Sequence, residues 1–119
     1  MGKVLVIGAS PNPKRYSFLA IRKLLLQGKE VIAIGKRKGT IGSCTIITNK
    51  PAIENVDLII LYINSEKQKE YYNYILQLYP GKILFNPGTE NSELARIALD
   101  NNIEIVYDCA LTLINSRLL

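Results

Sequence analysis

The feature that most constrains the fold of this chain is an alternation between short apolar runs and segments with helical spacing. The runs that predict strands are residues 4–8, 30–35, 44–47, 57–63, 82–85 and 103–107. The segments that predict helices are residues 18–27, 65–79 and 92–101. Strands that are apolar throughout are buried on both faces, as in a parallel sheet covered by helices. Because parallel crossovers are right-handed, the pattern predicts an α/β fold with a Rossmann-like, doubly wound parallel sheet in three layers.

The length of the chain limits the number of domains. A chain of 119 residues fits one domain and buries enough surface to fold without disulfides or metals. We therefore expect residues 1–119 to form a single Rossmann-like domain. The longest strongly apolar run, residues 58–63, is far shorter than the ~20 residues that a membrane-spanning helix needs. The sequence predicts a cytoplasmic protein that makes no membrane contact.

Local signals predict the ends of several elements. Ser17 is expected to be the N-cap of the first helix. Ser65 is expected to open the second helix, where Gln68 completes a capping box. Residues 36–43 contain two glycines and predict a loop. The segment after Asp108 has no decisive pattern, so its structure stays open.

Histidine is absent from the chain, and this absence excludes many kinds of chemistry. Ser–His–Asp and Cys–His catalysis, phosphohistidine transfer and most zinc sites all need histidine. The two cysteines, Cys44 and Cys109, form neither a disulfide framework nor a zinc motif. Cys109 follows a strand and could be a nucleophile, but we expect it to be inert, because no cation is close in sequence. We expect no catalytic residues and no metal site.

The loop after the first strand carries groups suited to an anion. Such loops lie at the C-terminal edge of the sheet, where Rossmann folds bind their ligands. A glycine at the strand end allows close backbone approach, and the following helix offers free N–H groups to a pyrophosphate. The groups in this loop are Gly8, Ser10, Lys14, Arg15 and Ser17. The alternative is a proline-rich turn without a ligand, because neither the G-x-G-x-x-G fingerprint nor a Walker A loop is present.

The loop after the second strand is strongly basic, with Lys36, Arg37 and Lys38 in succession. NAD-binding proteins usually carry an acidic residue at this point, where this chain has Gly35 and Lys36. A cation here suits a phosphate on the ribose, which coenzyme A (CoA) and NADP carry and NAD lacks. The net charge of +5 likewise favours anionic partners. A solvated charged loop is the alternative interpretation.

Aromatic residues gather in residues 71–79, but this segment does not indicate nucleic-acid binding. Such binding calls for exposed aromatic side chains interleaved with basic ones. Only Lys67 and Lys69 are close by, and Glu66 and Glu70 offset them. We expect the tyrosines to pack, and we expect no specific nucleic-acid partner.

One longer motif resembles a known family. Residues 6–13, Val-Ile-Gly-Ala-Ser-Pro-Asn-Pro, resemble the small stand-alone CoA-binding proteins, relatives of the CoA-binding domain of the succinyl-CoA synthetase alpha subunit. The resemblance covers nearly the whole chain and implies a Rossmann-like domain that binds CoA without catalysis. It implies that Gly8, Ser10, Lys14, Arg15 and Ser17 surround the diphosphate. It further implies Lys36 and Arg37 near the phosphoribose, and Tyr62, Ile63, Asn64, Pro87 and Gly88 along the remaining wall.

The first functional hypothesis is therefore non-catalytic binding of CoA or an acyl-CoA. The second is a small enzyme, either an NADP-dependent reductase or an acyl-CoA enzyme that uses Cys109. The third is a regulatory protein with a vestigial nucleotide crevice. A homodimer stays open, because nothing in the sequence decides the oligomeric state.

Overall fold

A computed structural model describes residues 2–119, and its centre is one mostly parallel sheet. Six strands run parallel, and the short β3 (Thr40–Ile41) pairs antiparallel with its neighbour. The parallel strands are β1 (Lys3–Ile7), β2 (Val31–Ile34), β4 (Cys44–Ile47), β5 (Val56–Leu61), β6 (Lys82–Phe85) and β7 (Glu104–Tyr107). The order across the sheet is β3-β4-β2-β1-β5-β6-β7. Counted along the chain, the parallel strands have the order 3-2-1-4-5-6, which is that of Rossmann folds.

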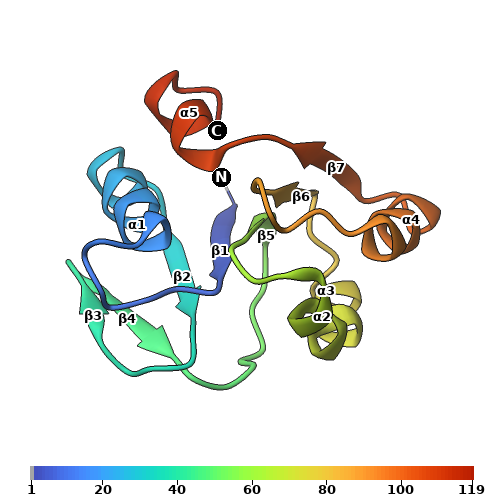
Figure 1. The fold of residues 1–119 in the computed structure, drawn as a ribbon, viewed down its shortest axis with the longest axis horizontal. Helices are drawn as coiled ribbons and strands as arrows, with labels where there is room; N and C mark the ends of the chain where they lie inside the picture. Colours follow the sequence, from blue (N-terminus) through green and yellow to red (C-terminus); the bar gives the residue numbers. More distant parts are fainter. Residues whose placement is uncertain (1) are drawn as a thin grey trace.

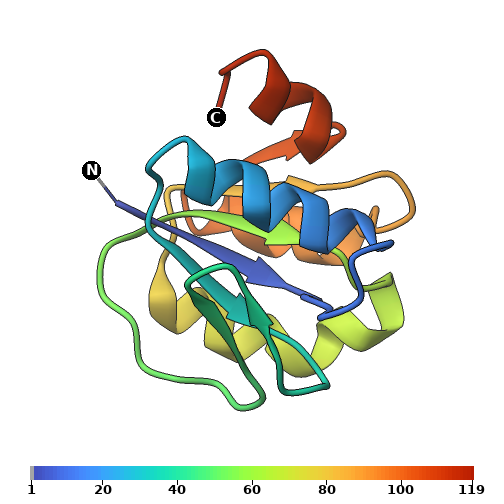
Figure 2. The same ribbon diagram turned by 90° about the vertical axis from the view of Figure 1, so that its left-hand side faces the viewer.

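Helices cover both faces of the sheet and make three layers (Figure 1). One face carries α1 (Tyr16–Leu26) and α5 (Ala110–Asn115), which pack side by side. On the other face lie α2 (Ser65–Gln68), the 3-10 turn η1 (Lys69–Tyr71), α3 (Tyr72–Leu78) and α4 (Ser92–Asp100). Figure 2 shows α1 lying across the strands on its side of the sheet. The predicted fold class is therefore confirmed for the described part of the single domain; only Met1 lies outside it.

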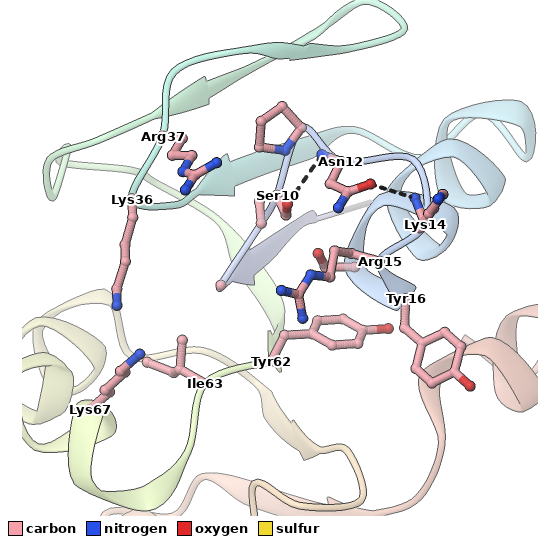
Figure 3. Close-up of a pocket in the computed structure, with 14 residues that line it drawn as sticks. Ser10, Asn12, Lys14, Arg15, Tyr16, Lys36, Arg37, Tyr62, Ile63 and Lys67 are labelled. Atoms are coloured by element: carbon pink, nitrogen blue, oxygen red, sulfur yellow. Dashed lines mark hydrogen bonds between the residues drawn. The ribbon is translucent and has the colours of Figure 1, made fainter.

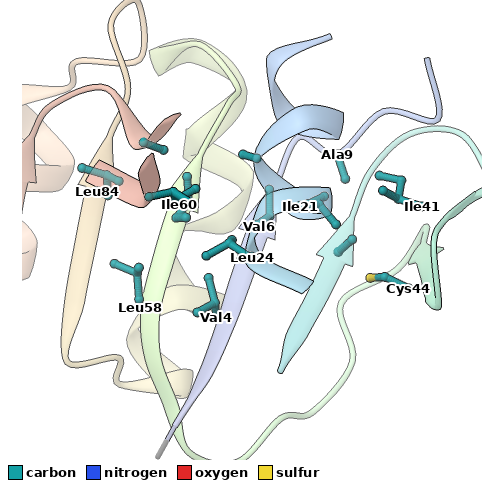
Figure 4. Packing of buried hydrophobic residues seen from close by; sticks show 14 of the residues in the cluster. Val4, Val6, Ala9, Ile21, Leu24, Ile41, Cys44, Leu58, Ile60 and Leu84 are labelled. Carbon is teal, nitrogen blue, oxygen red and sulfur yellow. The ribbon is translucent and has the colours of Figure 1, made fainter. Parts of the chain in front are cut away.

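The core explains why the strands are apolar at every position. Along β1, Val4 and Val6 pack toward α1, whereas Leu5 and Ile7 pack into the opposite layer, where α3 and α4 lie. Figure 4 shows the first of these layers, in which Ile21 of α1 faces the strands. Burying a side chain of this size stabilises the fold by about 1.5–3 kcal/mol. Because alternate side chains of such a strand are buried in the two layers, every buried position of the strand carries an apolar residue.

The first strand of the β3–β4 hairpin, β3, lies within residues 36–43, which the sequence predicted to be a loop. Ile41 pairs with Cys44 across a two-residue turn, and Gly42 has a φ of 57°. Ile41 is also fully buried in the layer under α1. Two paired residues are too few to give an alternating pattern, so the strand follows from tertiary packing.

Two predicted helix N-caps are wrong, although α2 begins at Ser65 as predicted. The first helix begins at Tyr16, with Arg15 at the N-cap, so Ser17 lies inside the first turn and is buried. The second helix is capped by Asn64, whose side chain accepts from the Lys67 backbone N–H at 3.0 Å. It is also not continuous, since α2, η1 and α3 replace the predicted single helix. The open segment after Asp108 forms α5.

Candidate functional site

The strand order reverses between β1 and β5, and the candidate site lies at the C-terminal ends of these strands. Gly8 follows β1 with a φ of 101°. A Cβ atom at this position would come within 3.0 Å of the Tyr62 carbonyl carbon and of the Ile63 side chain. The C-terminal ends of strands β1 and β5 therefore approach closely only because residue 8 has no side chain.

Side-chain hydrogen bonds shape the loop between β1 and α1. The Asn12 backbone N–H donates to the Ser10 hydroxyl at 3.1 Å, and the Lys14 N–H donates to Asn12 Oδ1 at 3.0 Å. The Arg15 N–H donates to the Asn12 carbonyl at 3.0 Å. These turns start α1 two residues earlier than the position of Ser17 suggested. They also bring Lys14 and Arg15 to the N-terminus of α1, whose first turn contains no acidic residue.

The basic loop after β2 lies directly against the β1 loop. A Cβ atom at Gly35 would clash with the Ala9 carbonyl oxygen, and one at Gly39 would come within 2.6 Å of Pro11. Both glycines therefore allow the two loops to touch. The contact brings Lys36 and Arg37 to the same edge as the helix N-terminus of α1.

The two loops enclose a first cavity of about 570 Å³, shown in Figure 3. Its lining includes five cationic side chains and no carboxylate: Lys14, Arg15, Lys36, Arg37 and Lys67. Nine of the predicted site residues line it: Gly8, Ser10, Lys14, Arg15, Ser17, Lys36, Arg37, Tyr62 and Ile63. The cations come from three different segments, so folding brings together charge that the sequence scatters.

A second cavity of about 600 Å³ continues from the first toward β6 and α5. The two cavities share Tyr16, Tyr62, Ile63 and Lys67, so they form one groove. The three remaining predicted residues line this second cavity: Asn64, Pro87 and Gly88. Lys67 is its only charged lining residue.

Asn86 fixes the far wall of the second cavity. Its Nδ2 donates to the Leu61 carbonyl at 2.9 Å, and its Oδ1 accepts from the Ala110 N–H at 2.8 Å. The Thr89 hydroxyl donates to the Asn86 carbonyl at 2.8 Å. One buried amide thus joins the end of β5, the loop after β6 and the start of α5.

Gln68 joins the near wall to the same loop. It is fully buried, and its Nε2 donates to the carbonyls of Ile63 at 2.9 Å and Thr89 at 2.7 Å. Its Oε1 accepts from Asn91 Nδ2 at 2.9 Å. Gln68 is therefore a connector between two loops and not the capping-box residue that the sequence predicted.

Two titratable groups meet in the second cavity. The Tyr62 hydroxyl is buried and has no hydrogen-bond partner among residues 2–119. Burial, followed by the nearby Cys109, raises the pKa of Tyr62. Hydrogen bonding from the backbone of Thr112, at the start of α5, lowers the pKa of the Cys109 thiol. Cys109 is half-buried, as expected, and these hydrogen bonds favour its thiolate form.

The sequence did not predict several residues of the groove, chiefly Tyr16, Lys67, Asn86 and Thr89. Lys67 carried a usable signal, because it lies in the first turn after a strand that ends at the crevice. Tyr16 had no such signal, since its place depends on where α1 begins. Within residues 2–119 no acidic, cysteine or histidine cluster could hold a metal, and no helix is long and apolar enough to cross a membrane.

The family of the chain follows from a match to a known sequence model. The model of the CoA binding domain matches residues 2–115. The chain belongs to the CoA binding domain family. This match covers both loops of the first cavity and the whole lining of the second. Among curated proteins, none is similar enough to count as a relative.

Solved structures share the fold of this family member. A crystal structure described as an uncharacterized protein is 44% identical, with a TM-score of 0.95, covering 100% of this chain and 98% of that one. A protein from Thermus thermophilus is 20% identical, with a TM-score of 0.85, and covers 99% of this chain and 91% of its own. A hypothetical protein from Pyrococcus horikoshii OT3 is 22% identical, with a TM-score of 0.83, covering 98% and 82%. The last two support the fold alone.

Proposed function

We propose that this protein binds CoA or an acyl-CoA without catalysing a reaction on it. The observation that carries the proposal is the convergence of five cations, with no carboxylate among them, at the switch point of a Rossmann sheet. A cluster of positive charge without carboxylates attracts anions, and phosphate groups form strong charge-assisted hydrogen bonds with lysine and arginine. Membership of the CoA binding domain family supports the same ligand.

The first cavity fits the phosphates of the cofactor. Gly8 lines this cavity, and Ser10, Lys14 and Arg15 surround the first turn of α1. That helix has no acidic residue in its first turn and no side-chain cap, so its N–H groups and partial positive charge are available to a diphosphate. Lys36 and Arg37 would hold the phosphate on the ribose.

The second cavity fits the neutral arm of CoA. A pantetheine arm is thin, carries two amides and ends in a thiol. Tyr62, Asn64 and the backbone around Gly88 offer polar contacts, while Ile63 and Pro87 offer apolar ones. The Tyr62 hydroxyl, which has no hydrogen-bond partner among residues 2–119, would form a hydrogen bond with an amide of the arm that lies beside it. Residues of both cavities thus match the two chemical halves of CoA.

The lining of the groove also supports binding without catalysis. General acid–base chemistry near neutral pH most often uses a histidine or a carboxylate within reach of the substrate. The lining residues of both cavities include neither a carboxylate nor a histidine. The pKa of Cys109 is lowered by the backbone and hydroxyl of Thr112 and by the backbone of Leu111, and not by a basic side chain. We therefore assign it no catalytic role.

Calorimetric titration with CoA, NADP and NAD tests the proposal. We expect CoA to bind most tightly, because NADP lacks the thin arm for the second cavity and NAD lacks the ribose phosphate as well. Equal heats for the three, or none, would remove the proposal. NADP binding more tightly than CoA would favour the alternative cofactor. A thiol assay after titration with acetyl-CoA completes the experiment, since released thiol would contradict the non-catalytic part.

A further inference from the structure

Two lysines from different segments of the chain meet across the first cavity. Lys36 follows β2, and Lys67 lies in α2 on the other side of the switch point. In Figure 3 the two side chains extend toward one another from opposite walls, with their nitrogen atoms at the tips. They meet on the side of the cavity away from Lys14 and Tyr16.

No carboxylate within residues 2–119 pairs with either lysine. The ion pairs of the described residues are Lys69 with Glu66 and Lys82 with Glu104. Contact with Lys36 lowers the pKa of Lys67, first through the side-chain interaction and then through charge repulsion; Glu70 is too weak to reverse this. Two ammonium groups that face each other without an acid are complementary to a doubly negative ligand.

The position of the pair indicates which phosphate it holds. The N-terminus of α1, with Ser10 and Arg15, is the place for the diphosphate. In Rossmann folds the ribose lies toward the end of the second strand, and here Lys36 begins the loop at that point. A phosphomonoester carries about −1.5 to −2 charges at pH 7, which matches two ammonium groups.

We propose that Lys36 and Lys67 form a two-lysine clamp across the groove for the ribose phosphomonoester, and that Lys67 thereby selects CoA over dephospho-CoA. This inference rests on the proposed function and deepens it. Lys67 would contact the phosphate from the wall opposite Lys36. The residues of the β2 loop cannot make this contact, so Lys67 would be a specificity residue. The clamp also explains why a like-charge pair persists here without an acidic partner.

Calorimetric titration of single variants with CoA and with dephospho-CoA tests the clamp. Lys67→Gln should weaken CoA binding about tenfold, the loss expected for one charge-assisted hydrogen bond. The same variant should change dephospho-CoA affinity less than twofold. Lys69→Gln is the matched control, because it removes the same charge two residues farther along the chain and lies outside both cavities. Lys67→Arg should keep the preference for CoA.

The outcomes distinguish a failure of the two-lysine clamp from a failure of the proposed CoA binding. If Lys67→Gln weakens both ligands equally, the clamp is wrong while CoA binding stands. The same holds if the wild-type protein binds CoA and dephospho-CoA alike. If the wild-type protein binds neither, the proposed function and the clamp both fail. Lys67 is exposed, so circular dichroism and thermal melting should show a folded variant; if Lys67→Gln does not fold, Lys67→Ala replaces it.

Discussion

The two halves of the groove differ sharply in charge although they share one wall. The half over β1 and β2 has five cationic lining residues, whereas the half over β6 and α5 has only Lys67. The first is built from loops held by Asn12 and by glycines that allow close contact. The second is built from buried amides, chiefly Gln68 and Asn86, that hold backbone segments together.

This difference indicates how one small domain can recognise a ligand with two unlike ends. Charge in the first half supplies attraction, which is long-ranged but unspecific. The second half offers shape and a few polar atoms, which attract weakly but discriminate between ligands. Tyr62 and Ile63 belong to both halves, so the turn after β5 is the point where the two kinds of recognition meet.

The largest expected effect comes from reversing charge in the first half. Lys36→Glu with Arg37→Glu should weaken CoA binding by about 100-fold or more, because the carboxylates would repel the phosphates and two charge-assisted contacts would be lost. Calorimetry measures the change. Arg22→Glu with Arg96→Glu is the control, since it changes the net charge equally and touches neither cavity. Equal losses in both variants would mean that overall charge, and not this loop, attracts the ligand.

A smaller effect should distinguish the two cysteines. Hydrogen bonds from Thr112 lower the pKa of Cys109, whereas burial raises the pKa of Cys44. The thiolate is the reactive form, so near pH 8 iodoacetamide should label Cys109 at least tenfold faster than Cys44. Saturating CoA should slow the labelling of Cys109, because this thiol lines the second cavity. Mass spectrometry of the labelled peptides measures both rates.

Labelling that CoA does not slow would contradict the place assigned to the arm. The Lys36→Glu, Arg37→Glu protein supplies the control, since CoA should protect its Cys109 only at much higher concentration. If CoA protects Cys109 in the wild-type protein but not in this variant, one CoA molecule occupies both halves of the groove.

The smallest effect concerns the junction of the halves. Tyr62→Phe removes a buried hydroxyl that has no partner among residues 2–119, so the free protein should become more stable by about 1 kcal/mol. The melting temperature should rise by about 3–5 °C. CoA affinity should fall by less than tenfold if an amide of the arm uses this hydroxyl. A destabilised Tyr62→Phe protein would mean that the hydroxyl already has a partner, such as water.

The strands and most residues that line the two cavities could be predicted from the sequence, whereas the way the loops meet could not. Apolar runs such as residues 4–8 indicated strands because burial on both faces leaves no other composition. The β3–β4 hairpin gave no pattern, because its pairing covers two residues of β3. The start of α1 was misplaced because Asn12 forms turns that compete with the capping signal of Ser17.

The sequence by itself determined the layers, the edge of the sheet at which the candidate site lies, and the excess of positive charge in its loops. These properties follow from local composition and from the handedness of crossovers, which every segment obeys separately. Only the tertiary structure decided that Lys36 faces Lys67, that Gln68 joins two walls, and that the Tyr62 hydroxyl has no partner among residues 2–119. Such facts depend on distances between segments far apart in the chain, and residue identity alone does not encode them.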